Sequence, residues 1–265
     1  MKHFPQKLAC LGLLALAACG SETVTPTSGA GSASAHGMMN GGPTYRGGAD
    51  GAPRNPQAFE PHSRPFGTSM ERWSERLWDW VYSIPSSENP LLDLTGVDCA
   101  VQQPDGPVWY LPPVLDPGGT ATFTRSCTVP HNKALLLLTS GVLNDFPCPD
   151  PTFAPADGQT LYEFLLAGAQ GGPDSITAQS LILDGVKLAH IFDYRETSDD
   201  LFDVNGDLSL QTTLDGCITG SPQPAVSDAF VLMLRPLDPG AHTLVYNAKD
   251  NHGTNVTLIY NLTIQ

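Results

Sequence analysis

The sequence is poor in positive charge and in long apolar segments. Only 13 of its 265 residues are Lys or Arg, against 27 Asp and Glu, and the formal net charge is −14. A chain this acidic repels the phosphates of nucleic acids and anionic lipid headgroups, which excludes nucleic-acid binding as a function. No apolar stretch reaches the roughly 20 residues that a membrane-spanning helix needs. We therefore expect no transmembrane anchor.

The sequence motifs of common catalytic classes are also missing. The nucleophile motif Gly-x-Ser-x-Gly does not occur, and neither does a glycine-rich phosphate loop. A group of acids could hold a carboxylate pair for glycoside hydrolysis, although acid clusters in loops are usually solvated surface. These acids are Asp193, Glu196, Asp199 and Asp200. We assign no catalytic residue from the sequence.

Glycine and proline, by contrast, are abundant, with 26 and 24 residues. Charged residues make up just 15% of the chain. This composition is typical of a turn-rich β protein rather than a helical one.

The first residues have the layout of an export signal. A short basic start with Lys2 and Lys7 precedes an apolar run, 8–18, and small residues lead to Cys19. Cysteine directly after Leu-Ala-Ala resembles the lipobox of bacterial lipoproteins. The resemblance implies that residues 1–18 are removed, that Cys19 carries lipid, and that the protein works outside the cytoplasm. Gly20 in place of Asp favours the outer membrane or the cell surface.

Residues 19–66 are rich in Gly, Ser, Ala, Thr and Pro and show no apolar periodicity. Such a segment cannot bury enough surface to offset the entropy of ordering it. The sequence predicts a disordered tether here, followed by a single domain over residues 67–265.

Four cysteines remain after the signal and the lipidation site: Cys99, Cys127, Cys148 and Cys217. An even number in an oxidising compartment predicts two disulfides. Four cysteines allow three pairings, and the residues alone do not choose among them, although we favour Cys99–Cys127 with Cys148–Cys217. A zinc site is disfavoured because the sequence has no Cys-x-x-Cys pair and no nearby histidine.

One helix is predicted over residues 68–83. Thr68 and Glu71 have the spacing of a capping box, and Ile84-Pro85 ends the segment. The apolar residues recur at helical spacing and predict a face that packs on the core: Met70, Trp73, Leu77, Trp80 and Val81. The charged residues are expected on the other side: Glu71, Arg72, Glu75, Arg76 and Asp79.

Beyond residue 90 the apolar pattern changes to that of short strands between turns. The predicted strands are 107–111, 121–124, 133–139, 161–166, 180–183, 188–192, 230–234, 242–246 and 256–264. Asp184-Gly185 predicts a tight hairpin, and residues 237–264 a closing one. The fold class that follows is mainly β: an antiparallel β-sandwich of jelly-roll or immunoglobulin-like type with one N-terminal amphipathic helix.

An ordered set of motifs resembles an uncharacterised family of secreted bacterial proteins over residues ~70–265. The motifs are Trp73…Trp80, 83–85, 89–90, 93–96, 99–100, 106–111, 125–130, 133–135 and 236–243. The resemblance implies the helix-plus-β fold and the Cys99–Cys127 pair, and it implies no activity.

The strongest metal motif is Asp203-Val-Asn205-Gly-Asp207, which resembles the opening of a calcium loop. The match fails later, where Leu208 stands in place of Gly and Leu214 in place of the bidentate acid. The alternative interpretation is a two-residue hairpin at Asn205-Gly206, with no metal.

Together these patterns predict a lipid-anchored binding or structural module of the cell envelope. Its expected partners are the membrane, through the lipid, and a polysaccharide or protein. The alternatives left open are an extracellular hydrolase acting on glycan or ester, and a calcium- or metal-binding lipoprotein.

Overall fold

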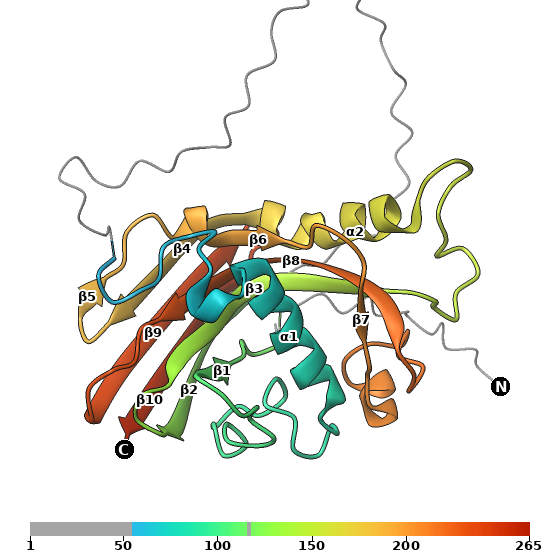
Figure 1. Ribbon diagram of the computed structural model, residues 1–265. Coiled ribbons are helices and arrows are strands. Elements are labelled where there is room, and N and C mark those ends of the chain that lie inside the picture. The colour runs from blue at the N-terminus through green and yellow to red at the C-terminus, as the bar shows by residue number, and fades with distance from the viewer. Residues whose placement is uncertain (1–54, 116–117) are drawn as a thin grey trace, which may run out of the picture.

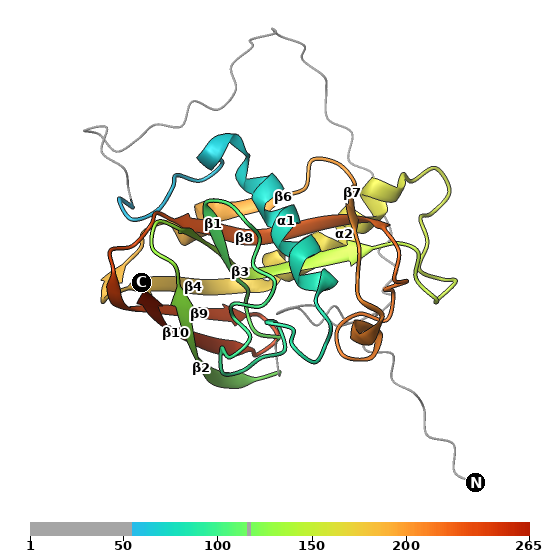
Figure 2. The ribbon, with the colours of Figure 1, turned by 60° about the horizontal axis from the view of Figure 1, so that its bottom comes forward.

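A computed structural model of the chain describes residues 55–115 and 118–265. The predictions for the signal peptide, for Cys19 and for most of the tether lie outside these ranges. Within them the chain is mainly β, as predicted, with two five-stranded sheets and two α-helices (Figures 1 and 2). In the part that is described, no helix has both the length and the apolar character to cross a bilayer.

The elements follow one another along the chain, with α for α-helices, η for 3-10 helices and β for strands. They are η1 (Pro65–Gly67), α1 (Met70–Ser83), β1 (Val108–Leu111), β2 (Thr120–Val129), β3 (Ala134–Asp145), α2 (Leu161–Ser175), β4 (Ile176–Leu183), β5 (Val186–Lys187), η2 (Ile191–Tyr194), β6 (Arg195–Thr197), β7 (Phe202–Val204), η3 (Leu208–Thr212), β8 (Gln223–Leu234), β9 (Gly240–Asp250) and β10 (Asn255–Ile264).

The two sheets are mixed rather than purely antiparallel, which corrects the predicted antiparallel sandwich. The first sheet has the order β1-β3-β8-β6, with β7 also paired to β8, and the second has the order β2-β10-β9-β4-β5. In each sheet one edge strand runs parallel to its neighbour, β1 to β3 and β2 to β10. Alternation of apolar residues sets which face a residue occupies, but it carries no information about strand direction.

Strands β3 and β8 form the centre of the molecule and are buried on both faces. Leu136, Met233 and their neighbours on one face pack under α1. On the opposite face, Leu137, Leu232 and others meet the second sheet. The molecule is therefore layered, with α1 outside the first sheet and the second sheet behind it (Figure 2).

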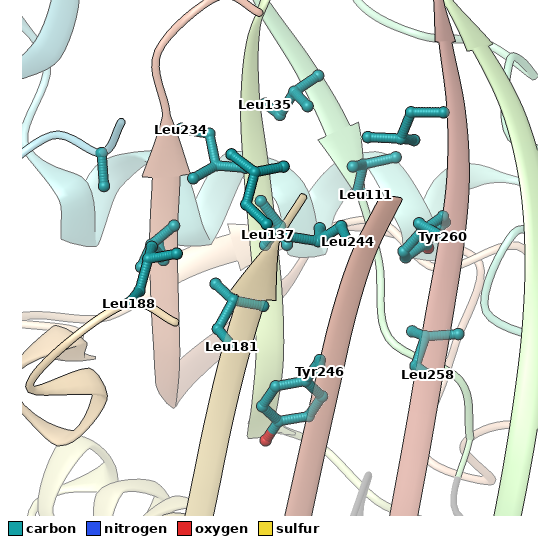
Figure 3. Close-up of a cluster of buried hydrophobic side chains, with 14 of the residues drawn as sticks. Leu111, Leu135, Leu137, Leu181, Leu188, Leu234, Leu244, Tyr246, Leu258 and Tyr260 are labelled. Atoms are coloured by element: carbon teal, nitrogen blue, oxygen red, sulfur yellow. The ribbon is translucent and has the colours of Figure 1, made fainter. Parts of the chain in front are cut away.

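The core between the sheets is built from leucines of both sheets and from two tyrosines of the second sheet. Figure 3 shows Leu137 of β3 facing Leu181 of β4 and Leu244 of β9, with Tyr246 and Tyr260 at the side. All of these side chains are at most 4% exposed. Each buried Leu or Tyr of this kind stabilises the fold by about 1.5–3 kcal/mol relative to the exposed state.

Helix α1 forms as predicted, but it begins one residue later than expected. Ser69 rather than Thr68 is the N-cap, and its hydroxyl accepts a hydrogen bond from the backbone N–H of Arg72. Trp73, Trp78 and Trp80 are at most 7% exposed, so the tryptophans belong to the core. Glu75, which we expected at the surface, is also buried. Burial raises its pKa to about 7, although the adjacent Arg72 partly offsets the effect.

Helix α2 stands where a strand at 161–166 was predicted, so that prediction is wrong. Thr160 and Glu163 form a complete capping box, the motif that had been assigned to the other helix. The helix covers the far end of β3 and β8, where Val142 and Val226 pack against Leu165. A side chain at Gly168 would clash with the amide of Asn144, so glycine allows the helix to approach β3 closely.

Two further local predictions are wrong and two are confirmed. Residues 191–194 form η2 instead of a strand, and Asn205-Gly206 links β7 to η3 instead of closing a hairpin. Asp184-Gly185 does join β4 to β5, with positive φ at both residues as a tight hairpin turn requires. The closing hairpin is β9 paired with β10.

The predicted tether ends earlier than residue 66. Asn55 is 5% exposed, and its amide donates to Ala189 O and to Tyr194 Oη, each at 3.0 Å. Ala58 is fully buried and forms an antiparallel bridge with Leu234 of β8. Residues 55–66 therefore belong to the folded domain.

Both disulfides form with the favoured pairing, Cys99–Cys127 and Cys148–Cys217. The first pins the loop at 93–103 against β2, an edge strand, and Ser126 N donates to Thr95 O there at 2.8 Å. Disulfides persist in oxidising compartments, so the protein is extracytoplasmic.

Arg125 closes the open edge between the two sheets. Its side chain is 2% exposed and points inward from β2. Nη1 donates to the carbonyls of Pro112 and Pro113 and to Tyr260 Oη at 3.0, 3.1 and 2.9 Å. The guanidinium thereby joins the segment after β1 to β2 and β10.

Replacing Arg125 by Met should lower the free energy of unfolding by about 3 kcal/mol, because the substitution removes the donor of the buried Pro113 carbonyl and of Tyr260 Oη. Urea denaturation measures the loss. Arg235→Met is the control: Arg235 is exposed and stacks on Phe59, so its removal should change stability by at most about 0.5 kcal/mol. Equal effects of the two substitutions would contradict the role assigned to Arg125.

Candidate functional site

The outer face of the second sheet carries a regular array of small polar side chains. On β2, β10 and β9, exposed and half-exposed residues alternate with residues buried in the core between the sheets. Strand pairing aligns the outward residues in three rows, which we call the hydroxyl face: Ser126–Asn261–Thr243, Thr124–Ile259–Val245 and Thr122–Thr257–Asn247.

The hydroxyl face combines hydrogen-bonding rows with an apolar one. Neighbouring strands lie about 4.8 Å apart, and alternate residues lie about 6.7 Å apart along a strand, so the side chains form a flat grid. The middle row presents Ile259 and Val245, and the rows beside it present hydroxyls and amides. Asn247 Nδ2 donates to Thr257 Oγ1 at 2.9 Å, which holds one of these rows in place.

A shallow hollow of about 270 Å³ lies at one end of this face. Its lining includes Ser126, Thr243 and Asn261. Asn261 lies between the other two because β10 pairs with β2 on one side and with β9 on the other. The hollow therefore offers donors and acceptors from three strands to one ligand.

No residue of the three rows is charged, although the chain carries a net charge of −14. The nearest titratable group identified at the hollow is His242, which is largely turned to other partners. Its Nδ1 lies 2.7 Å from Asp184 Oδ2, and Nε2 lies 2.8 Å from Asp238 O. These hydrogen bonds raise the pKa of His242. Two charged side chains border the face: Asp184, whose Oδ1 accepts from Thr243 N at 2.8 Å, and Lys249, which is exposed on β9 two residues after Asn247. The three rows themselves carry no charge and can accept an uncharged ligand.

The three residues of the predicted calcium motif do not form a loop of the EF-hand type. Asp203 is exposed on β7, and Asn205 follows in the connection to η3. Asp207 is the N-cap of η3, where its carboxylate accepts from Ser209 N at 2.9 Å and from Ser209 Oγ at 2.6 Å. These bonds lower the pKa of Asp207. Calcium binding stays a prediction.

The candidate hydrolytic acids have separate environments. Glu196 is buried on β6 and accepts from His62 N at 3.0 Å, while its other close contact is His62 Nδ1 at 3.2 Å. Burial raises its pKa. Asp199 and Asp200 are exposed in the loop after β6, and Asp193 lies in η2. We therefore still assign no catalytic residue.

A buried acid pair was missed in the sequence. Asp145 ends β3, Asp215 follows η3, and the oxygens of their carboxyl groups approach within 4.8 Å. Asp145 is 2% exposed, and its Oδ2 has no hydrogen-bond donor among the described residues. Asp215 accepts from Cys217 N at 2.9 Å and from Tyr82 Oη at 3.5 Å.

Two carboxylates held this close and largely out of solvent repel each other, which favours a single proton shared between Asp145 and the half-buried Asp215. Burial, and then the charge of Asp215, raises the pKa of Asp145 to about 8. Burial also raises the pKa of Asp215. Protonated Asp145 can then donate to the Asp215 carboxylate.

The signal for this pair was present in the cysteine pattern. Asp145 precedes Cys148 by three residues, and Asp215 precedes Cys217 by two. Because Cys148 and Cys217 are bonded, the disulfide brings the two acids into the same region of the fold. The favoured Cys148–Cys217 pairing therefore indicated that Asp145 and Asp215 are neighbours.

Comparisons with known proteins give no family for the chain. No family model and no curated protein matches it. A chain of the solved structure described as PbICP-C in complex with falcipain-2 is similar with 12% identity and a TM-score of 0.24. The similarity covers 59% of this chain and 98% of that one.

Asp145→Asn should remove a pH dependence of stability. The folded-state pKa of Asp145 is raised from 3.8 to about 8, so the folded protein binds a proton that the unfolded chain releases. The contribution of Asp145 to the free energy of unfolding should therefore fall as pH rises from about 4 to 8, by at most about 1.4 kcal/mol per pH unit.

Urea denaturation at a series of pH values checks this expectation. In the Asp145→Asn variant the free energy of unfolding should depend less steeply on pH, since the amide donates to Asp215 without ionising. Asp157→Asn, at an exposed position, is the matched control and should keep the slope of the unmodified protein. A slope unchanged by Asp145→Asn would exclude the shared proton.

Proposed function

We propose that this protein is a lipid-anchored, extracytoplasmic binding module of the cell envelope that captures an uncharged polysaccharide on its hydroxyl face. The observation that carries the proposal is an uncharged grid of hydroxyl and amide side chains on a strongly acidic chain. A polymer with a regular repeat can bond to such a grid at many points, so weak individual contacts add up to stable attachment.

The chemistry of the face matches that of a sugar chain. Pyranose rings present apolar C–H faces and polar hydroxyl edges. The row containing Ile259 and Val245 offers apolar contact, while Asn261, Thr243 and Thr257 offer hydrogen bonds. A charged polymer would gain nothing from this surface, and an anionic one would also be repelled by the net charge.

The anchor is supported by the lipobox-like sequence that ends at Cys19. Several acyl chains hold a protein firmly at a membrane, because each buried CH₂ contributes about 0.8 kcal/mol. Gly20 favours the outer membrane over the inner one.

Cys19→Ser should release the protein from the membrane. Without the thiol no diacyl group is added, and the signal peptide is not removed by the lipoprotein route. Detergent phase partitioning of cell fractions, together with mass spectrometry of the N-terminus, measures the outcome. Cys10→Ser, within the signal, is the control and should leave the anchor intact. An unmodified N-terminus in the native protein would exclude the anchor.

Asn261→Lys should weaken binding to particulate cellulose and chitin, two ordered uncharged polysaccharides, because it places a long charged chain at the centre of the hollow. Co-sedimentation of the purified protein measures binding, which should be insensitive to salt. Thr212→Lys, exposed on η3, is the control that adds the same charge elsewhere. If neither polymer sediments the native protein, this function is contradicted.

A further inference from the structure

A second concavity lies on the opposite side of the molecule from the hydroxyl face. It is a groove of about 360 Å³ between α1 and the segment that leads into β1. Helix α1 packs on the side of the first sheet that faces away from the second sheet, so the two surfaces are separated by the whole sandwich. The volume is near the lower end for small-molecule sites, which suits a short ligand.

Three aromatic residues border the groove, but only one ring is open to solvent, since Trp73 and Tyr110 are 6% and 3% exposed. Phe66, Trp73 and Tyr110 all line it. Phe66 is 50% exposed, which is unusual for so large an apolar side chain. Its ring contacts Phe59 edge-on, with centroids 5.8 Å apart, and its remaining surface is open to solvent.

The backbone at Phe66 is strained as well. Its φ of 56° and ψ of 28° lie in the left-handed region, which a bulky residue rarely occupies. Glycine would fit this conformation without strain. The fold thus holds an aromatic ring at the mouth of the groove although the backbone there favours glycine, and strain of this kind concentrates at ligand sites.

The polar groups of the groove are balanced in charge. Arg76 and Asp105 both line it and are both exposed. The guanidinium of Arg76 lies over the Trp73 ring, 4.9 Å from its centroid, and has no ion-pair partner among the described residues. Stacking fixes the plane of the guanidinium and leaves its N–H edges available to a ligand.

We propose that this groove binds a short run of uncharged hexose units. The exposed ring of Phe66 supplies the apolar surface on which a pyranose stacks. The N–H groups of Arg76 and the carboxylate of Asp105 bond to its hydroxyls. One cation and one anion favour a ligand without net charge. The inference deepens the proposed function, since it gives the same class of polymer a second contact on the side away from the hydroxyl face.

Titration of the purified protein with cellotetraose and chitotetraose tests the groove. Calorimetry and the intrinsic tryptophan fluorescence of the protein measure binding. Phe66→Gly should weaken binding about tenfold through loss of the stacked ring. It should leave the melting temperature unchanged or higher, because glycine relieves the strain. Arg76→Gln should weaken binding by a similar factor.

Two controls match these changes away from the groove. Phe192→Ala removes another exposed ring, which is 47% exposed in η2, and Lys187→Gln removes one positive charge on β5. Both should bind as the native protein does. No binding of either tetrasaccharide, or binding that Phe66→Gly and Arg76→Gln leave unchanged, would overturn the proposal.

The groove and the hydroxyl face can fail separately. A native protein that binds the tetrasaccharides but does not co-sediment with either polymer would contradict the proposal for the hydroxyl face alone. If co-sedimentation depends on Asn261 but the protein binds neither tetrasaccharide, the proposal for the groove alone is contradicted.

Discussion

Two strands buried on both faces set the architecture of this protein. Residues of β3 and β8 are apolar toward both sides, so each face of the strand pair must be covered. The second sheet covers one face over part of its length, and α2 extends that cover toward the far end. Helix α1 covers the other face with its tryptophans. The outer surfaces of these covering layers are left free for recognition.

The edges of the sheets are closed by particular contacts rather than by further strands. Edge strands with free backbone groups invite pairing with other chains. Here the loop held by Cys99–Cys127 lies along β2, where the Cβ of any residue at position 96 other than glycine would clash with the backbone of Ser126. Arg125 ties the neighbouring edge of the first sheet to β2 and β10. The buried guanidinium of Arg125, bonded to backbone carbonyls, thus connects the two sheet edges in place of strand pairing.

The sequence was sufficient where a local pattern decides the structure. Trp73, Leu77 and Val81 recur at helical spacing, and the helix is present; Asp184-Gly185 allows the positive φ of a tight turn, and the turn is present. Leu161–Leu166 is an apolar run compatible with strand or helix, and the local capping box of Thr160 and Glu163, which marks the helix, was overlooked. The sequence was insufficient where distant contacts decide. The hydroxyl face depends on the parallel register of β2 with β10, which alternation does not encode.

The N-terminal segment has a mechanical consequence. Its residues pair with the end of β8: Phe59 N donates to Met233 O, and Arg235 N donates to Gln57 O. A pull on the N-terminus therefore acts first on Asn55, which is bonded to Ala189 and Tyr194, and then on the end of β8. At β8 the load is shared with β3 across a long antiparallel ladder.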